Sequence, residues 1–224
     1  MKRISQVWKK YEYGKVARAM LLLLALFLIL EHMHIFPMHY MQSSIDRAIP
    51  FTAQFVWPYL AWFPYIVFSF FWFSTKDHDE YVRMTKMILF GWAAFLIFSF
   101  FYPTMLSLRP GSVGSGISAL ACSIIYAVDS PSNVFPSMHV YVTLCFAITY
   151  MRRIRSGGYV PELYRIINPM LTILIPLSTL FVKQHSVADV VASCVMASIM
   201  YVAVYRDPLR VNSTGFVRVL RKIK

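Results

Sequence analysis

Three ionisable side chains, Lys183, His185 and Asp189, lie at the junction of two apolar runs that cover residues 166–182 and 190–205. Ionisable groups at the edge of a membrane-spanning segment are costly and usually functional. His185 and Asp189 are four positions apart, so on a helix they would share one face and touch. A carboxylate beside one imidazole nitrogen fixes the tautomer and leaves the other nitrogen basic, which suits a nucleophile or a general base.

A second histidine, His139, stands just before another apolar run, after Asn133-Val-Phe-Pro-Ser137-Met. Two histidines at one site allow a division of labour, in which one attacks phosphorus and the other protonates the leaving oxygen. Phosphoryl transfer needs mostly positioning and charge stabilisation. This scheme requires no metal ion, and the sequence predicts no cofactor.

The elements that must position these residues are membrane helices. Of the 224 residues, 58% are hydrophobic and 14% are charged, against about 45–50% and about 25% in soluble domains. Apolar runs long enough to span a bilayer recur along the chain. The sequence therefore predicts an all-α, polytopic membrane protein with six transmembrane helices. We expect spans at residues 19–36, 51–73, 87–105, 135–151, 166–182 and 186–205, a charged loop at 76–86, and a small interfacial helix at 117–128 before the fourth span.

The distribution of cations orients this predicted domain, residues 19–205. Six spans put the basic N-terminus (1–18) and the basic tail (206–224) on one side, together with 19 of the 22 Lys and Arg residues. The positive-inside rule then places both termini in the cytoplasm. This distribution explains the net charge of +12 without nucleic acid, and we expect the basic termini to contact anionic lipid headgroups.

Only Arg47, Arg109 and Lys183 fall on the opposite side, and the last two belong to the loops that carry the histidines. An arginine fork suits phosphate oxygens, and a lysine adds a point charge. Ser137 could donate to an anion where the fourth span begins, or simply cap that helix. The pattern predicts an anionic ligand at the non-cytoplasmic surface, although Lys183 could instead be an interfacial anchor.

These residues resemble the three-part signature of the type 2 phosphatidic acid phosphatase superfamily, which reads Lys-x6-Arg-Pro, Pro-Ser-Gly-His and Ser-Arg-x5-His-x3-Asp. The matching segments are Arg109-Pro110, Pro136-Ser137-Met138-His139, and Ser178-Thr179 followed by His185 and Asp189. The resemblance implies that His185 is the nucleophile, that Asp189 orients it and that His139 is the general acid. It also implies that Arg109 and Ser137 bind phosphate.

Tyr102, Met138 and Thr179 stand where the superfamily pattern has Lys, Gly and Arg. Lys183 could replace one of the missing cations. The segments around Asp129 and Asn133 and around Lys183 are most similar to the branch that includes inositol phosphorylceramide synthases. Tyr102, Asp129, Asn133 and Thr179 are therefore possible further site residues, while Asp129 and Asn133 are also common turn formers.

The resulting expectation is a membrane phosphatase that hydrolyses a lipid phosphate or pyrophosphate at the extracytoplasmic face, through a phosphohistidine. Two alternatives stay open: a phosphotransferase that moves a phospho-alcohol headgroup between lipids, and a non-catalytic lipid-binding or transport protein. The short loops favour a bacterial plasma membrane, with the active site facing outside. Glu31 could pair with a histidine or line a lipid portal, and the cluster of His32, His34 and His39 lacks the partners of a metal site.

Overall fold

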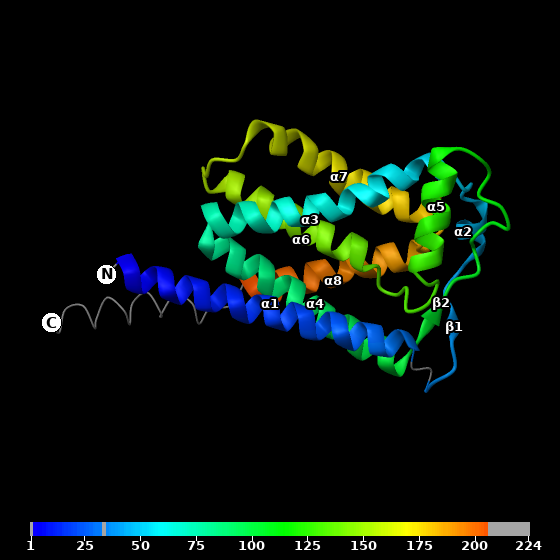
Figure 1. The fold of residues 1–224 in the computed structure, drawn as a ribbon, viewed down its shortest axis with the longest axis horizontal. Coiled ribbons are helices and arrows are strands. Elements are labelled where there is room, and N and C mark those ends of the chain that lie inside the picture. Colours follow the sequence, from blue (N-terminus) through cyan, green and yellow to red (C-terminus); the bar gives the residue numbers. More distant parts are fainter. Residues whose placement is uncertain (1, 33–34, 206–224) are drawn as a thin grey trace.

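Long helices packed side by side make up the body of the protein (Figure 1). The computed structural model describes residues 2–32 and 35–205, with side chains described from residue 14 on and not for His32. The long helices are α1 (Lys2–His32), α3 (Val56–Lys76), α4 (His78–Phe101), α6 (Met138–Arg155), α7 (Glu162–Phe181) and α8 (Val187–Tyr205). Four of these regions, residues 53–76, 78–101, 162–181 and 187–205, are long and apolar enough to cross a membrane. The protein is thus mostly helical, with the character of an integral membrane protein.

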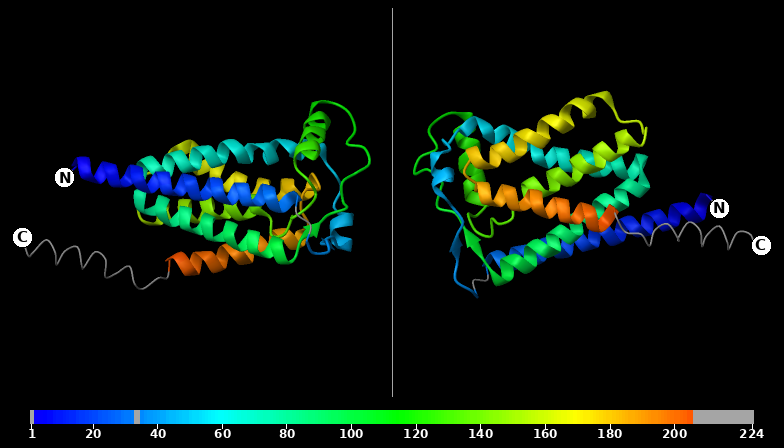
Figure 2. Two further views of the ribbon diagram at one scale, coloured as in Figure 1. Left: turned by 60° about the horizontal axis from the view of Figure 1, so that its bottom comes forward. Right: turned by 180° about the vertical axis from the view of Figure 1, so that it is seen from behind.

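The shorter elements gather at one end of the bundle, as both views in Figure 2 show. They are α2 (Ser44–Ala48), the 3-10 helix η1 (Ala53–Phe55), α5 (Ile117–Val128) and the strands β1 (His39–Tyr40) and β2 (Thr104–Met105). The strands pair in parallel, with His39 opposite Thr104. The predicted short helix at 117–128 is confirmed with the same bounds.

The charged loop predicted at 76–86 is wrong, because α4 already begins at His78. Asp77 caps this helix, its side chain accepting a hydrogen bond from the N–H of Glu80 at 3.2 Å. Tyr81 and Met84 are buried on the inner face of the first turns. An N-cap followed by an amphipathic pattern starts a helix even where the sequence is charged. Helix α1 also begins well before the predicted first span (19–36), because the basic segment predicted at residues 1–18 is helical from Lys2 on. The ends of the other long helices differ from the prediction by at most five residues, and the predicted tail (206–224) lies outside the described residues.

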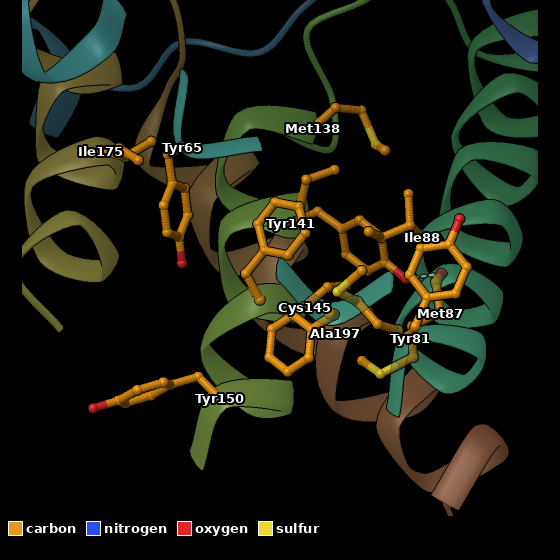
Figure 3. Close-up of a cluster of buried hydrophobic side chains, with 14 of the residues drawn as sticks. Tyr65, Tyr81, Met87, Ile88, Met138, Tyr141, Cys145, Tyr150, Ile175 and Ala197 are labelled. Carbon is orange, nitrogen blue, oxygen red and sulfur yellow. Dashed lines mark hydrogen bonds between the residues drawn. The ribbon is translucent and has the colours of Figure 1, made fainter. Parts of the chain in front are cut away.

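Helix α6 contacts α3, α4, α7 and α8, and so holds a central place in the core. Tyr141 donates a hydrogen bond from its hydroxyl to the carbonyl of Met87 in α4, and Cys145 packs one turn further along (Figure 3). The ring of Tyr141 occupies the space beside Gly91, where an added Cβ would lie 2.1 Å from a ring carbon. Gly91 therefore permits the close approach of α6 and α4 that fixes His139, two residues before Tyr141.

Candidate functional site

His185 lies in the turn between α7 and α8, two residues before α8 begins. Our expectation that His185 and Asp189 share a helix face is therefore wrong, although the two side chains are close. The N–H of Ser186 donates to Asp189 Oδ2 at 2.7 Å, and the N–H of Asp189 donates to Ser186 Oγ at 3.2 Å. This reciprocal capping box turns the carboxylate back toward the chain that enters the helix.

The capping box places Asp189 Oδ2 3.4 Å from Nδ1 of His185. That nitrogen makes no hydrogen bond to any described residue, and neither does Asp189 Oδ1, which is also buried. The carboxylate lies beside Nδ1, and a hydrogen bond between them would set the tautomer of His185 and leave Nε2 basic.

Contacts with α2 hold the His185 turn on both sides. Two residues before it, Lys183 donates from Nζ to the carbonyl of Asp46 at 2.7 Å and to that of Ile49. Two residues after it, the N–H of Val187 donates to Asp46 Oδ1 at 2.7 Å. Burial lowers the pKa of Lys183. Burial alone would raise the pKa of Asp46, but hydrogen bonds from Val187 and Ser43 outweigh it and lower that pKa.

His139 lies in the first turn of α6 and is surrounded by rings. Its centroid is 4.5 Å from that of Tyr59, 4.3 Å from that of Trp62 and 5.7 Å from that of His185. Nε2 of His139 is buried and has no hydrogen-bond partner among the described residues. Ser137 caps α6 just before it, accepting from the N–H of Val140 at 3.4 Å. The aromatic packing holds the His139 ring without occupying Nε2.

Arg109 braces the loops around the histidines. Its guanidinium donates to the carbonyl of Tyr126 at 3.1 Å, to the carbonyl of Asp129 at 2.6 Å and to Gln184 Oε1 at 2.6 Å. Asp129 Oδ2 accepts from the hydroxyl of Tyr59 at 2.8 Å and from Gln184 Nε2 at 3.3 Å. Burial lowers the pKa of Arg109 and raises that of Asp129, even though the bond from Tyr59 opposes the second shift.

A cavity of about 130 Å³ connects the two histidines. Its polar wall consists of Asp129, Ser130, Ser132, Asn133, His139, Gln184 and His185, and its apolar wall includes Phe27, Trp62, Trp92 and Phe95. Neither Arg109 nor Lys183 belongs to this wall. Within the described part of the chain, an anion in the cavity would meet imidazole, amide and hydroxyl groups and the carboxyl group of Asp129, with Arg109 behind Gln184.

Of the remaining predicted site residues, Asn133 lines the cavity, whereas Thr179 and Tyr102 do not. The Oδ1 atom of Asn133 is buried without a partner among the described residues. The hydroxyl of Thr179 donates a hydrogen bond to the carbonyl of Pro176. The carbonyl of Thr179 accepts hydrogen bonds from the N–H groups of Gln184 and His185, so Thr179 helps to form the turn that carries His185. Tyr102 stacks on His39 with centroids 3.8 Å apart, away from the cavity wall.

Four residues that hold or line the site were not predicted from the sequence: Asp46, Tyr59, Trp62 and Gln184. The pattern Ser43-x-x-Asp46 signals a capping box, which the structure contains, but nothing local connects it with His185. No group of three potential metal ligands occurs in the described residues. Of the histidine cluster considered in the sequence, His34 and the side chain of His32 lie outside the described part of the chain.

No family model, no curated protein and no solved structure matches this chain.

Proposed function

We propose that this protein is a membrane enzyme that hydrolyses a lipid phosphate or pyrophosphate by way of a phosphohistidine on His185. The observation that carries this proposal is the meeting of His139 and His185 in one cavity, with their ring centroids 5.7 Å apart. Asp189 Oδ2 supports it from behind, 3.4 Å from the Nδ1 atom of His185. The pattern is that of a nucleophile, its orienting carboxylate and a second group able to move a proton.

In the proposed reaction, Nε2 of His185 attacks phosphorus and the bond from phosphorus to the leaving oxygen breaks. A protonated His139 gives its proton to that oxygen, which departs as an alcohol or a phosphate. Neutral His139 then accepts a proton from water as the water attacks the phosphohistidine. Inorganic phosphate leaves, and both imidazoles return to their starting states. Gln184 and Asn133 both line the cavity wall, and in this reaction their side-chain amides would contact the phosphoryl oxygens.

The proposed topology has six spans with both termini in the cytoplasm and the cavity at the outer face. The ends of α4 and α7 and the starts of α6 and α8 lie at the same end of the bundle as α5 (Figure 1). Lys183 and Arg109 are at that end, whereas Arg152 and Arg153 lie at the opposite one. This distribution supports the orientation by the positive-inside rule, and the short loops favour a bacterial plasma membrane.

The aromatic part of the cavity wall favours a second candidate, transfer to an alcohol. Phe27, Trp62, Trp92 and Phe95 limit the room for water beside the histidines. In this case a lipid alcohol, and not water, would attack the phosphohistidine. The products distinguish the two reactions, because hydrolysis releases phosphate and transfer gives a new phospholipid.

The test is phosphate release from a panel of lipid phosphates and pyrophosphates by purified protein in detergent with EDTA. We expect His185→Ala to reduce release by roughly 10⁴-fold or more. His39→Ala is the matched control, since His39 lies at the same end of the bundle but outside the cavity wall. Phosphohistidine without release, until an alcohol acceptor is added, would establish transfer. Saturable lipid binding with neither product would replace both reactions by a binding function.

A further inference from the structure

A second hollow lies on the surface of the bundle, between α1 and α4. Its volume is about 410 Å³, and its wall consists of Ala17, Met20, Leu21, Leu23, Leu24 and Trp92. Every one of these side chains is apolar or aromatic. Trp92 also lines the histidine cavity, so this one residue forms part of the wall of both hollows. We call the hollow between α1 and α4 the chain groove.

One face of α1 continues from the chain groove into the cavity. Phe27 follows Leu23 by four residues, so it lies on the same helix face. Phe27 lines the histidine cavity, and its ring meets that of Trp92 edge to face with centroids 6.0 Å apart. One turn later Glu31 accepts a hydrogen bond at 2.5 Å from Ser130, which belongs to the polar wall. Helix α1 thus runs from an apolar groove to the polar rim of the same site.

We propose that the chain groove binds the hydrocarbon chain of the lipid whose phosphate reaches His139 and His185. This inference rests on the proposed function. It adds where the hydrocarbon chain of the substrate binds and that the lipid enters between α1 and α4. Ala17 and Phe27 are ten residues apart, which is about 15 Å of helix. That length is about half of a hydrocarbon core of roughly 30 Å, so the groove accommodates a chain from one leaflet.

A larger hollow between α3 and α7 provides an internal comparison. It has about 600 Å³ and an almost wholly apolar wall, which includes Ala61, Phe68 and Met170. Among the described residues, its wall has no member in common with the wall of the histidine cavity. A chain bound there would not lead its headgroup to the histidines. The shared wall residue Trp92 and the adjacent Phe27, and not size, therefore assign the chain to the α1–α4 side.

Photo-crosslinking locates the chain without requiring turnover. The probe is phosphatidic acid with a diazirine at the end of one acyl chain, added to His185→Ala protein in phosphatidylcholine nanodiscs. We expect labelled peptides from residues 17–27 and from the neighbourhood of Trp92, and loss of this label when excess unlabelled phosphatidic acid competes. Competed label on α3 and α7 would overturn the proposal. Label spread over all lipid-facing helices and insensitive to competition would also overturn it, because it would report bulk lipid.

Two matched substitutions test the groove by filling it. Ala17→Trp occupies its far end, whereas Ala61→Trp fills the hollow between α3 and α7. We expect Ala17→Trp to lower the specific label several-fold and to raise KM several-fold for dioleoyl but not for dioctanoyl phosphatidic acid, and Ala61→Trp to change neither. Leu21→Trp replaces Ala17→Trp if that variant does not fold. Equal effects of both fillings, or none from either, would refute the proposal.

The outcomes separate this inference from the proposed function. Specific label on α1 and α4 with no phosphate release by the wild-type protein would remove hydrolysis and keep the chain groove. Phosphate release that depends on His185, together with specific label elsewhere, would keep hydrolysis and remove the groove.

Discussion

The two histidines face one cavity but are held by different kinds of contact. The turn of His185 is fixed by hydrogen bonds from distant parts of the chain: Asp46 accepts from Val187 across 141 positions, and Arg109 donates to Gln184 across 75. The position of His139 is instead set by the close packing of α6 against Gly91 of α4 and by contacts with the rings of Tyr59 and Trp62. One side of the site is polar and directional, and the other is aromatic.

The difference fits the roles proposed for the two rings. A nucleophile must keep one nitrogen aimed at the phosphorus, and misplacement by about 1 Å can cost roughly 100-fold in rate. A proton carrier needs Nε2 left available, and that atom of His139 has no partner in the described part of the protein. The comparison predicts that changes on the polar side lower kcat more than conservative changes on the aromatic side.

Among changes to the residues that hold the two rings, the largest effect is expected from Asp189→Asn. The amide can still accept from the N–H of Ser186, but the negative charge 3.4 Å from His185 is lost. We expect hydrolysis to fall by about 10²–10⁴-fold, as when the orienting carboxylate of a catalytic triad is neutralised. The free energy of unfolding should change by less than about 1 kcal/mol. Both are measured on purified protein, by phosphate release and by denaturation.

Ser186→Ala is the matched control, because it removes the hydroxyl that accepts from the N–H of Asp189 and leaves the carboxylate in place. We expect it to destabilise the start of α8 by about 1 kcal/mol and to retain most of the activity. Equal losses of activity in the two variants would show that Asp189 serves only as a helix cap, and the proposed role of His185 would lose its support.

A smaller effect is expected where α2 holds the turn. Asp46→Ala leaves the N–H of Val187 without its acceptor, which costs about 1–3 kcal/mol when the group stays buried. We expect kcat to fall by roughly 10–100-fold with KM little changed. Asp46→Asn should recover most of kcat, because Oδ1 remains an acceptor. Steady-state kinetics on the three proteins measures both parameters.

Trp62→Phe tests the aromatic side against Asp46→Ala. It keeps a ring beside His139 and removes no hydrogen bond, since Nε1 of Trp62 has no partner among the described residues. We expect it to lower kcat by less than Asp46→Ala does. If Trp62→Phe were the more damaging variant, the division into a directional side and a packed side would be untenable.

Local patterns in the sequence were enough for the elements that depend on nearby residues. The short helix at 117–128 follows from an apolar run between Gly116 and Asp129, and the proximity of His185 and Asp189 follows from their spacing, although a capping box and not a continuous helix produces it. The start of α4 was not predicted, because the charged residues between 76 and 86 indicated a loop and the capping signal of Asp77 was not used.

The orientation of the two cations could not be predicted in this way. Arg109 and Lys183 fit the pattern of phosphate ligands, yet neither lines the cavity. They donate instead to backbone carbonyl groups and, from Arg109, to the side chain of Gln184. Their acceptors lie up to 137 positions away, and only the packed chain brings them together. Phosphate binding by these two residues stays a prediction, while their part in bracing the loops is visible in the structure.

The smallest effect, and a test within the polar side itself, concerns the pH dependence of stability. The pKa of Asp129 is raised above its ordinary 3.8 by burial, so its protonated form is favoured in the folded protein. It contributes stability that is full below pH 3.8 and is lost as the pH rises through the folded pKa. The pKa of Asp46 is lowered from the same 3.8, so its contribution is full above that pH and is lost as the pH falls through the folded pKa.

The two variants Asp129→Asn and Asp46→Asn should therefore differ from the wild type in opposite senses. Relative to wild type, Asp129→Asn gains stability as the pH rises above 3.8, whereas Asp46→Asn gains it as the pH falls below 3.8. Thermal midpoints in detergent between about pH 3 and pH 7 measure both differences. If the thermal midpoints of both variants changed with pH in the same direction relative to wild type, the pKa values of Asp46 and Asp129 would be shifted in the same direction. The hydrogen bonds from Val187 and Ser43 would then not outweigh the effect of burial at Asp46.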